Sequence, residues 1–174
     1  MFERHLAIDS NDRQGIRYLI GHEYLADGNV NKAEAYFEES IHEPGSRFGL
    51  AFLHIINGVE EKKLAFSLLQ AFAGNRYIAP MILDEDYDFL DGTYGSPVYW
   101  AASMNSHEWA EEYYFKNYRM WEAEYPRTIL SNWWNRVPVR SWRLALDESW
   151  QNPSRLKTLT NEKALKDLVT LCVV

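Results

Sequence analysis

Histidine and glutamate side chains are the residues of this chain that could hold a metal ion or move a proton, and their spacing favours neither role. The five histidines form no His-Glu-x-x-His motif, and no two of them lie four residues apart on one expected helix. His22-Glu23 and His107-Glu108 are neighbours in the sequence, but neighbours on a helix point about 100° apart. We therefore expect surface or groove histidines, and we predict no catalytic residue, no metal site and no cofactor.

The densest acidic segment has five carboxylates, at Asp84, Glu85, Asp86, Asp88 and Asp91. A calcium-binding loop that began at Asp84 would need glycine at its sixth position and glutamate at its twelfth. Those positions hold Phe89 and Gly95, so the calcium-loop interpretation fails. The segment is interpreted as a solvated acidic loop. The alternative is a secondary contact site for a basic partner, formed by Asp84, Asp86 and Asp88.

Nucleophilic chemistry has no clear candidate either. Cys172 is the single cysteine, which excludes an internal disulfide and a cysteine-based zinc site. It lies on an apolar helical face, and a reactive thiol would need a base and a polar setting. We therefore expect a small buried hydrophobic residue. The sequence also lacks a glycine-rich phosphate loop and a Gly-x-Ser-x-Gly motif.

One region combines aromatic and basic side chains, namely Trp133, Trp134, Trp142 and Trp150 with Arg136, Arg140 and Arg143. Three interpretations stay open: core packing with arginines over the ring faces, a hot spot for protein binding, or stacking on nucleic-acid bases. The net charge of -7 and the pI of about 5.2 count against nucleic acid and against an anionic membrane.

Composition favours one globular domain. The chain has 174 residues, of which 47% are hydrophobic and 25% charged. Its apolar runs are far shorter than the roughly 20 residues of a membrane span, and M-F-E-R-H-L has no apolar signal-peptide region. A cytoplasmic location is therefore expected. All seven tryptophans follow residue 99, so residues 1–81 and 82–174 are expected to build their parts of the core differently.

The elements that position these residues are expected to be helices. In residues 11–45, apolar residues recur at helical spacing on both sides of Asp27-Gly28-Asn29, which predicts two helices and a tight turn. Pro44-Gly45 is expected to close this unit. A second helix pair is predicted over residues 47–56 and 60–73, with Gly58 between them. The step from Ala33 to Ala65, and from Phe37 to Leu69, is 32 residues in both cases.

Further helices are predicted over residues 2–8, 98–104, 107–123, 128–134, 142–150 and 161–172, with a loop at 91–97. Asn105-Ser106 is expected to cap the helix that starts at residue 107. Tyr125-Pro126 and Asn152-Pro153 are expected to end helices, and Val137-Pro138-Val139 is expected to be a break.

The first helix pair resembles a tetratricopeptide repeat. Gly21 stands where that repeat has a small residue because the second helix crosses closely, and Tyr24, Ala33 and Phe37 also fit. Arg17 replaces the usual tryptophan. Residues 75–134, with N-R-Y-I-A-P-M-I-L, Y-D-F-L and E-W-A-E-E-Y, are similar to the helical repeat region of the suppressor-of-tumorigenicity-seven family and to a tail of some bacterial repeat proteins.

These resemblances imply an all-α fold, in which about two tetratricopeptide-like repeats pack on an irregular, Trp-rich helical half. They also imply a non-catalytic protein that binds a peptide or helix of a partner through its concave face. That face would carry Tyr18, His22, Leu25, Phe48, Phe52 and Ile55. Phe52→Asp is then expected to abolish binding while helix content is kept.

Three alternatives remain open. The Trp-rich half could cover the concave face and leave no groove. The chain could be an immunity protein or antitoxin that occludes a toxin, which its acidity and size would suit. It could also be a small helical enzyme.

Overall fold

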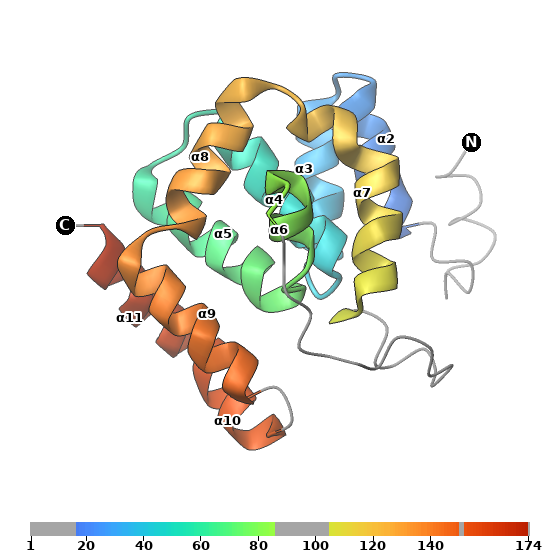
Figure 1. Cartoon of the computed structure of the whole chain (residues 1–174). Helices are drawn as coiled ribbons and strands as arrows, with labels where there is room; N and C mark the ends of the chain where they lie inside the picture. The colour runs from blue at the N-terminus through green and yellow to red at the C-terminus, as the bar shows by residue number, and fades with distance from the viewer. Residues whose placement is uncertain (1–16, 86–104, 150–151, 174) are drawn as a thin grey trace.

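The computed structural model describes residues 17–85, 105–149 and 152–173, and of Arg17 and Tyr18 only the backbone (Figure 1). These ranges contain ten helices and no strand, which confirms the all-α prediction. The helices are α2 (Arg17–Ala26), α3 (Val30–Glu39), α4 (Pro44–Ile56), α5 (Glu61–Gly74), α6 (Ile78–Leu83), α7 (His107–Trp121), α8 (Glu124–Trp134), α9 (Val137–Ser149), α10 (Pro153–Thr160) and α11 (Glu162–Cys172). The helices expected over 2–8 and 98–104, and the loop at 91–97, lie outside the described residues.

Glycines make the two turns of the first four helices. Gly28 has a φ of 74° and donates its N–H to the Leu25 carbonyl at 3.0 Å, which closes α2. Gly58 has a φ of 58° and bonds in the same way to Ile55 at 3.2 Å, after α4. Side chains disfavour this left-handed backbone, so glycine is preferred at both positions. Both predicted turns are confirmed.

The Phe37 ring lies in a narrow space between α2 and α4. A Cβ atom on Gly21 would lie 2.6 Å from Cε1 of Phe37, and one on Gly49 would lie 2.4 Å from its Cζ. Phe37 itself is 1% exposed. The expectation that Gly21 allows a close crossing is therefore confirmed, and Gly49 serves the same ring from a second helix.

Prolines begin helices in this chain. Pro44 and Pro153 are the first residues of α4 and α10, Pro138 is the second residue of α9, and Pro126 is the third residue of α8. The first N–H groups of a helix have no intrahelical acceptor, so proline loses nothing there. The expected closure at Pro44-Gly45, stop at Tyr125-Pro126 and break at Val137-Pro138-Val139 are therefore wrong, and α10 was not predicted.

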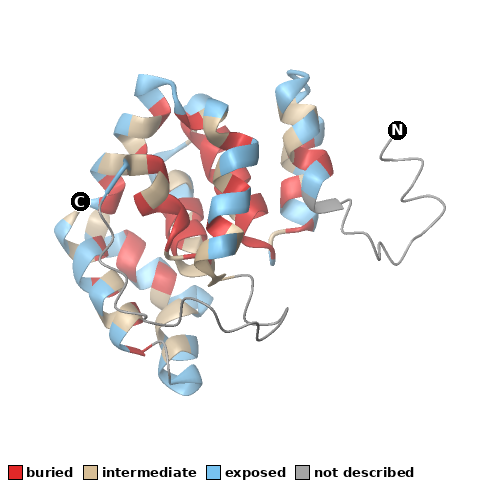
Figure 2. Ribbon diagram, turned by 45° about the vertical axis from the view of Figure 1, so that its right-hand side comes forward, coloured by how far each residue is buried: buried red, intermediate tan, exposed pale blue. Residues whose placement is uncertain are grey.

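One core joins the two halves of the chain. The Phe52 ring lies 5.2 Å from that of Trp121 on α7, and the Phe72 ring lies 4.9 Å from that of Trp134 on α8. Figure 2 shows the buried residues on the faces that the helices turn toward one another. Ala33, Phe37, Leu50 and Leu53 form a smaller cluster that packs α3 against α4.

The tryptophan and arginine region belongs to this core. Trp133, Trp134 and Trp142 are 3%, 1% and 9% exposed. The guanidinium of Arg136 lies 3.7 Å from the ring centre of Trp133, and that of Arg143 lies 3.3 Å from that of Trp134. This geometry is the predicted packing of arginine over ring faces.

No helix in the described ranges has both the length and the apolar character that crossing a bilayer needs.

Candidate functional site

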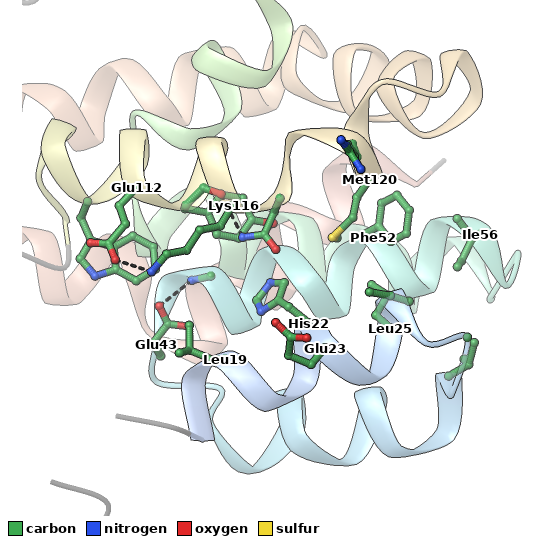
Figure 3. A pocket seen from close by; sticks show the side chains of 18 residues that line it. Leu19, His22, Glu23, Leu25, Glu43, Phe52, Ile56, Glu112, Lys116 and Met120 are labelled. Atoms are coloured by element: carbon green, nitrogen blue, oxygen red, sulfur yellow. Dashed lines mark hydrogen bonds and ion pairs between the residues drawn. The ribbon is translucent and has the colours of Figure 1, made fainter. Parts of the chain in front are cut away.

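A groove of about 1010 Å³ lies between α2, α4 and α7 (Figure 3). The helices α2 and α7 form its two walls, and α4 forms its floor. It brings residues of the expected concave face together with residues of the Trp-rich half.

The wall formed by α7 is fixed at its start by hydrogen bonds to the segment before α6. Ser106 caps α7, as predicted, because its Oγ accepts the N–H of Trp109 at 3.1 Å. Asn75 donates its side-chain amide to the Ser106 carbonyl at 3.1 Å, and Asn105 accepts the backbone N–H of Arg76 at 3.0 Å. These bonds hold the start of α7 beside the end of the second helix pair.

The buried face of α7 then packs on the start of α4. A Cβ on Gly45 would lie 2.9 Å from Cδ2 of Tyr113, so only glycine allows this close approach. The Tyr113 hydroxyl accepts the indole N–H of Trp121 at 3.2 Å, and burial raises the pKa of Tyr113 above its usual value. Tyr113 is therefore a neutral packing residue that positions the wall.

One end of the groove is apolar. Phe52, Leu25, Ile56 and Met120 surround it, as Figure 3 shows. Ile56 is 42% exposed at the rim, and Leu19, further along α2, is 38% exposed. Apolar side chains with this exposure leave hydrophobic surface that a ligand would remove from water.

The other end of the groove is polar. Glu112 and Lys116 form an ion pair one turn apart on α7 (Figure 3). Opposite them, Glu43 precedes α4 and is 2% exposed. Its Oε1 accepts the N–H of Gly45 at 3.0 Å, and its Oε2 accepts the N–H of Ser46 at 2.6 Å. Burial raises the pKa of Glu43, although these two N–H groups act in the opposite direction.

Three residues of the expected concave face line this groove, namely His22, Leu25 and Phe52. The His22 ring lies between the rings of Phe37, at 4.8 Å, and Tyr113, at 5.7 Å. Phe48 and Ile55 line no part of the groove. They are 0% and 1% exposed inside the core, which removes them from the residues that a partner could touch.

The structure also resolves how far the Trp-rich half covers the concave face. The Phe48 ring lies 5.9 Å from Tyr113 and 6.4 Å from Trp121, so α7 covers this part of α4. The same helix leaves the space above Phe52 and Leu25 open as a groove wall. The Tyr18 side chain lies outside the described residues.

The acidic segment is described only at its beginning. Asp84 has a φ of 54° at the end of α6, and its carboxylate forms an ion pair with Arg127 of α8. Glu85 accepts the indole N–H of Trp134 at 2.8 Å. Both carboxylates therefore bind groups of their own chain, while Asp86 and Asp88 lie outside the described residues.

Sequence reasoning missed Glu43 and the whole α7 wall. A signal for Glu43 was present, because an acceptor residue directly before Pro44 is the pattern of a helix start. No local signal existed for α7, since its residues lie about sixty positions after α4 in the sequence.

The described residues hold no group of three or more histidine, cysteine, aspartate or glutamate side chains arranged to bind a metal ion. Comparisons with protein-family models, with curated proteins and with solved structures find no match to this chain.

Proposed function

We propose that this protein is a non-catalytic binding protein, and that the groove between α2, α4 and α7 holds an amphipathic helix of a partner protein. The observation that carries the proposal is the groove itself, with its apolar end at Phe52, Leu25 and Met120 and its exposed rim at Ile56. Its volume of about 1010 Å³ lies at the upper end of the range for small-ligand pockets, which favours a larger occupant.

The length of the groove suits a short helix. Residues from Trp109 to Met120 line it, which is three turns of α7, or about 16 Å at 1.5 Å per residue. Helices that bind in grooves use apolar residues at positions i, i+4 and i+7, which span about 10 Å. Three such anchors fit within the length of the α7 wall.

Charge indicates which helix would bind. Glu23 on α2 and Glu43 before α4 both line the groove, and the chain as a whole has a net charge of -7. Two cations also line the groove, namely Arg119 and Lys116, and Lys116 is paired with Glu112. A partner helix with basic residues beside its apolar face would complement these carboxylates.

The proposal includes a tetratricopeptide-like arrangement of the two helix pairs α2–α3 and α4–α5. Ala33 and Ala65, 32 residues apart, are both 0% exposed, and Phe37 and Leu69 are 1% and 0% exposed. These equivalent burials support a repeat, although the sequence departs from the usual pattern at Arg17. A cytoplasmic location and the likeness of residues 75–134 to the suppressor-of-tumorigenicity-seven family remain parts of the same proposal.

The substitution suggested by the sequence, Phe52→Asp, is a poor test of this function. Phe52 is 8% exposed and its ring lies 5.2 Å from that of Trp121, so an aspartate would place a carboxylate in the core. Loss of binding would then be confused with loss of folding. Ile56→Lys is better, because Ile56 is exposed at the last position of α4, where a cation favours the helix dipole.

The test is a selection of random 16-residue peptides displayed on phage, with the wild-type protein as bait. We expect enriched peptides to carry apolar residues at helical spacing with lysine or arginine beside them. Ile56→Lys is expected to weaken their binding at least about 10-fold, because it puts a charge in the apolar rim and repels basic residues. The matched control is Leu144→Lys, which changes a residue that is 58% exposed on α9.

Equal binding of the peptides to both variants would contradict the groove as the site. A wild-type dimer in sedimentation that Ile56→Lys dissociates would instead assign the groove to a second copy of this chain. Enrichment of a peptide without helical periodicity would reject the helix as occupant.

A further inference from the structure

We propose that the carboxylate of Glu43 binds one lysine or arginine side chain of the partner helix, and so sets the position of that helix in the groove. This inference rests on the proposed function of the groove and names the group that the polar end recognises.

The first argument is that Glu43 is buried and forms no direct ion pair with a described residue. It is the one carboxylate among the buried residues of the described ranges, and it forms no ion pair with them. Burial raises the pKa of Glu43, and Arg47 acts in the opposite direction because it attracts the charged form. Nε and Nη1 of Arg47, however, donate to the carbonyls of Ile41, at 2.8 Å, and Gln70, at 3.2 Å. A buried carboxylate gains most from a cation that reaches it, because little water remains to stabilise its charge.

The second argument is that this carboxylate lies at the groove, beside aromatic rings. The position that a Cβ on Gly45 would take lies 3.2 Å from Glu43 Oε1, 3.0 Å from Trp109 Cη2 and 2.9 Å from Tyr113 Cδ2. All four residues line the groove. The rings of Trp109 and Tyr113 are nearly parallel, at 12°, with their centres 6.3 Å apart. Aromatic surface next to a carboxylate suits a side chain with an apolar stem and a cationic end.

The third argument is that the groove's own lysine is engaged elsewhere. Lys116 forms its ion pair with Glu112, on the same wall and one turn away (Figure 3). Glu43 faces the groove from the opposite side, where the backbone N–H groups of Gly45 and Ser46 and the side chain of Ser46 bond to its carboxylate. A carboxylate has about four acceptor sites, so these bonds leave room for one more donor.

The experiment uses a peptide obtained in the selection above whose binding to the full chain is lost in Ile56→Lys. Each lysine or arginine of that peptide is replaced in turn by norleucine, and the affinity is measured by fluorescence anisotropy. Wild-type protein, Glu43→Gln and Glu112→Gln are compared. Glu43 also caps α4, so the replacement in the peptide is decisive, because it leaves the protein unchanged.

We expect one peptide position at which norleucine weakens binding to the wild-type protein about 30-fold, as for a buried charge pair that loses one partner. At that position the same replacement is expected to change the affinity for Glu43→Gln by only about 2-fold. This is the deviation from additivity that is found for two sites that do not interact. Glu112→Gln should keep the 30-fold loss.

The inference is overturned if norleucine weakens binding to wild type and Glu43→Gln equally, or if the selected peptides contain no basic residue. In either case the groove remains the binding site, because Ile56→Lys still abolishes binding. If no selected peptide responds to Ile56→Lys, the proposed function fails and the role of Glu43 fails with it.

Discussion

Replacing Gly49 with alanine is expected to destabilise the protein because the added methyl group would meet the ring of Phe37. The new Cβ would lie 2.4, 2.6 and 2.8 Å from Cζ, Cε1 and Cε2 of that ring. Carbon atoms attract at roughly 3.5 to 4.0 Å, so the ring would have to move by more than about 1 Å. The ring cannot move toward α2, because it already lies so close to Gly21 that a Cβ on that residue would be 2.6 Å away from it.

The magnitude follows from two opposing contributions. Overpacking a core lowers the free energy of unfolding by about 1 to 3 kcal/mol. We expect a loss near about 3 kcal/mol here, because the Phe37 ring is held between two helices and cannot move away. Alanine in a helix interior raises the free energy of unfolding by about 1 kcal/mol relative to glycine. We therefore expect a net loss of about 2 kcal/mol in the free energy of unfolding, or a decrease in Tm of about 4 to 8 °C for a chain of this size.

The assay is urea unfolding followed by circular dichroism, in the wild-type and Phe37→Leu backgrounds. Leucine lacks Cε1, Cε2 and Cζ, so in that background Gly49→Ala should be neutral or should stabilise by up to about 1 kcal/mol. Gly58→Ala is the matched control. Gly58 has a φ of 58° and no atom within 4 Å of its would-be Cβ, so its loss of about 1 kcal/mol should be the same in both backgrounds.

A loss from Gly49→Ala that is as large in the Phe37→Leu background as in the wild type would refute the contact with Phe37 as the cause. A stabilised Gly49→Ala protein in the wild-type background would refute the close approach of the helices altogether.

Two further predictions concern His54 and Arg136. Burial first, and then Lys63, lower the pKa of His54, so the unfolded chain binds the proton more tightly. The free energy of unfolding should therefore fall as the pH drops below about 6.5, and this fall should be smaller in His54→Gln. Parallel pH profiles of His54→Gln and the wild type would contradict this reasoning. Arg136 donates to the Cys172 carbonyl at 2.7 Å and to the Glu61 carboxylate at 3.0 Å, and its guanidinium lies over the Trp133 ring. Lysine cannot make these contacts together, so Arg136→Lys should lower the free energy of unfolding by about 1 to 2 kcal/mol, as measured by urea unfolding. Arg140→Lys, at an exposed position of α9, should cost almost nothing, and an equal loss would show that Arg136 does not hold α11 in place.

Much of the helix order could be predicted from the sequence because it depends on local periodicity. The apolar spacing around Ala33 and Phe37 places one face of α3 inward, and both residues are buried. The turn at Gly28 and the cap at Ser106 are similarly local, since each depends on the backbone of a few neighbouring residues.

The errors at proline show where local reasoning was incomplete. Pro126 and Pro138 were each interpreted as an interruption of a helix. A proline is compatible with the first turn of a helix and not with its interior. Which of these applies depends on where the preceding helix ends, and the end of α7 at Trp121 and of α8 at Trp134 leaves each proline near the start of the next helix.

The sequence by itself determined the helical class, the positions of the main helices and the close approach at Gly21. Only the tertiary structure decided which apolar side chains stay at the surface. Phe48 and Phe52 lie four residues apart on α4, yet α7 buries the first against Tyr113 and leaves the second lining a groove. It also decided that Glu43 is buried, because its exposure depends on Trp109 and Tyr113, more than sixty residues away in the chain. Periodicity records which face of a helix is apolar, whereas the distance between two faces depends on how all the helices pack.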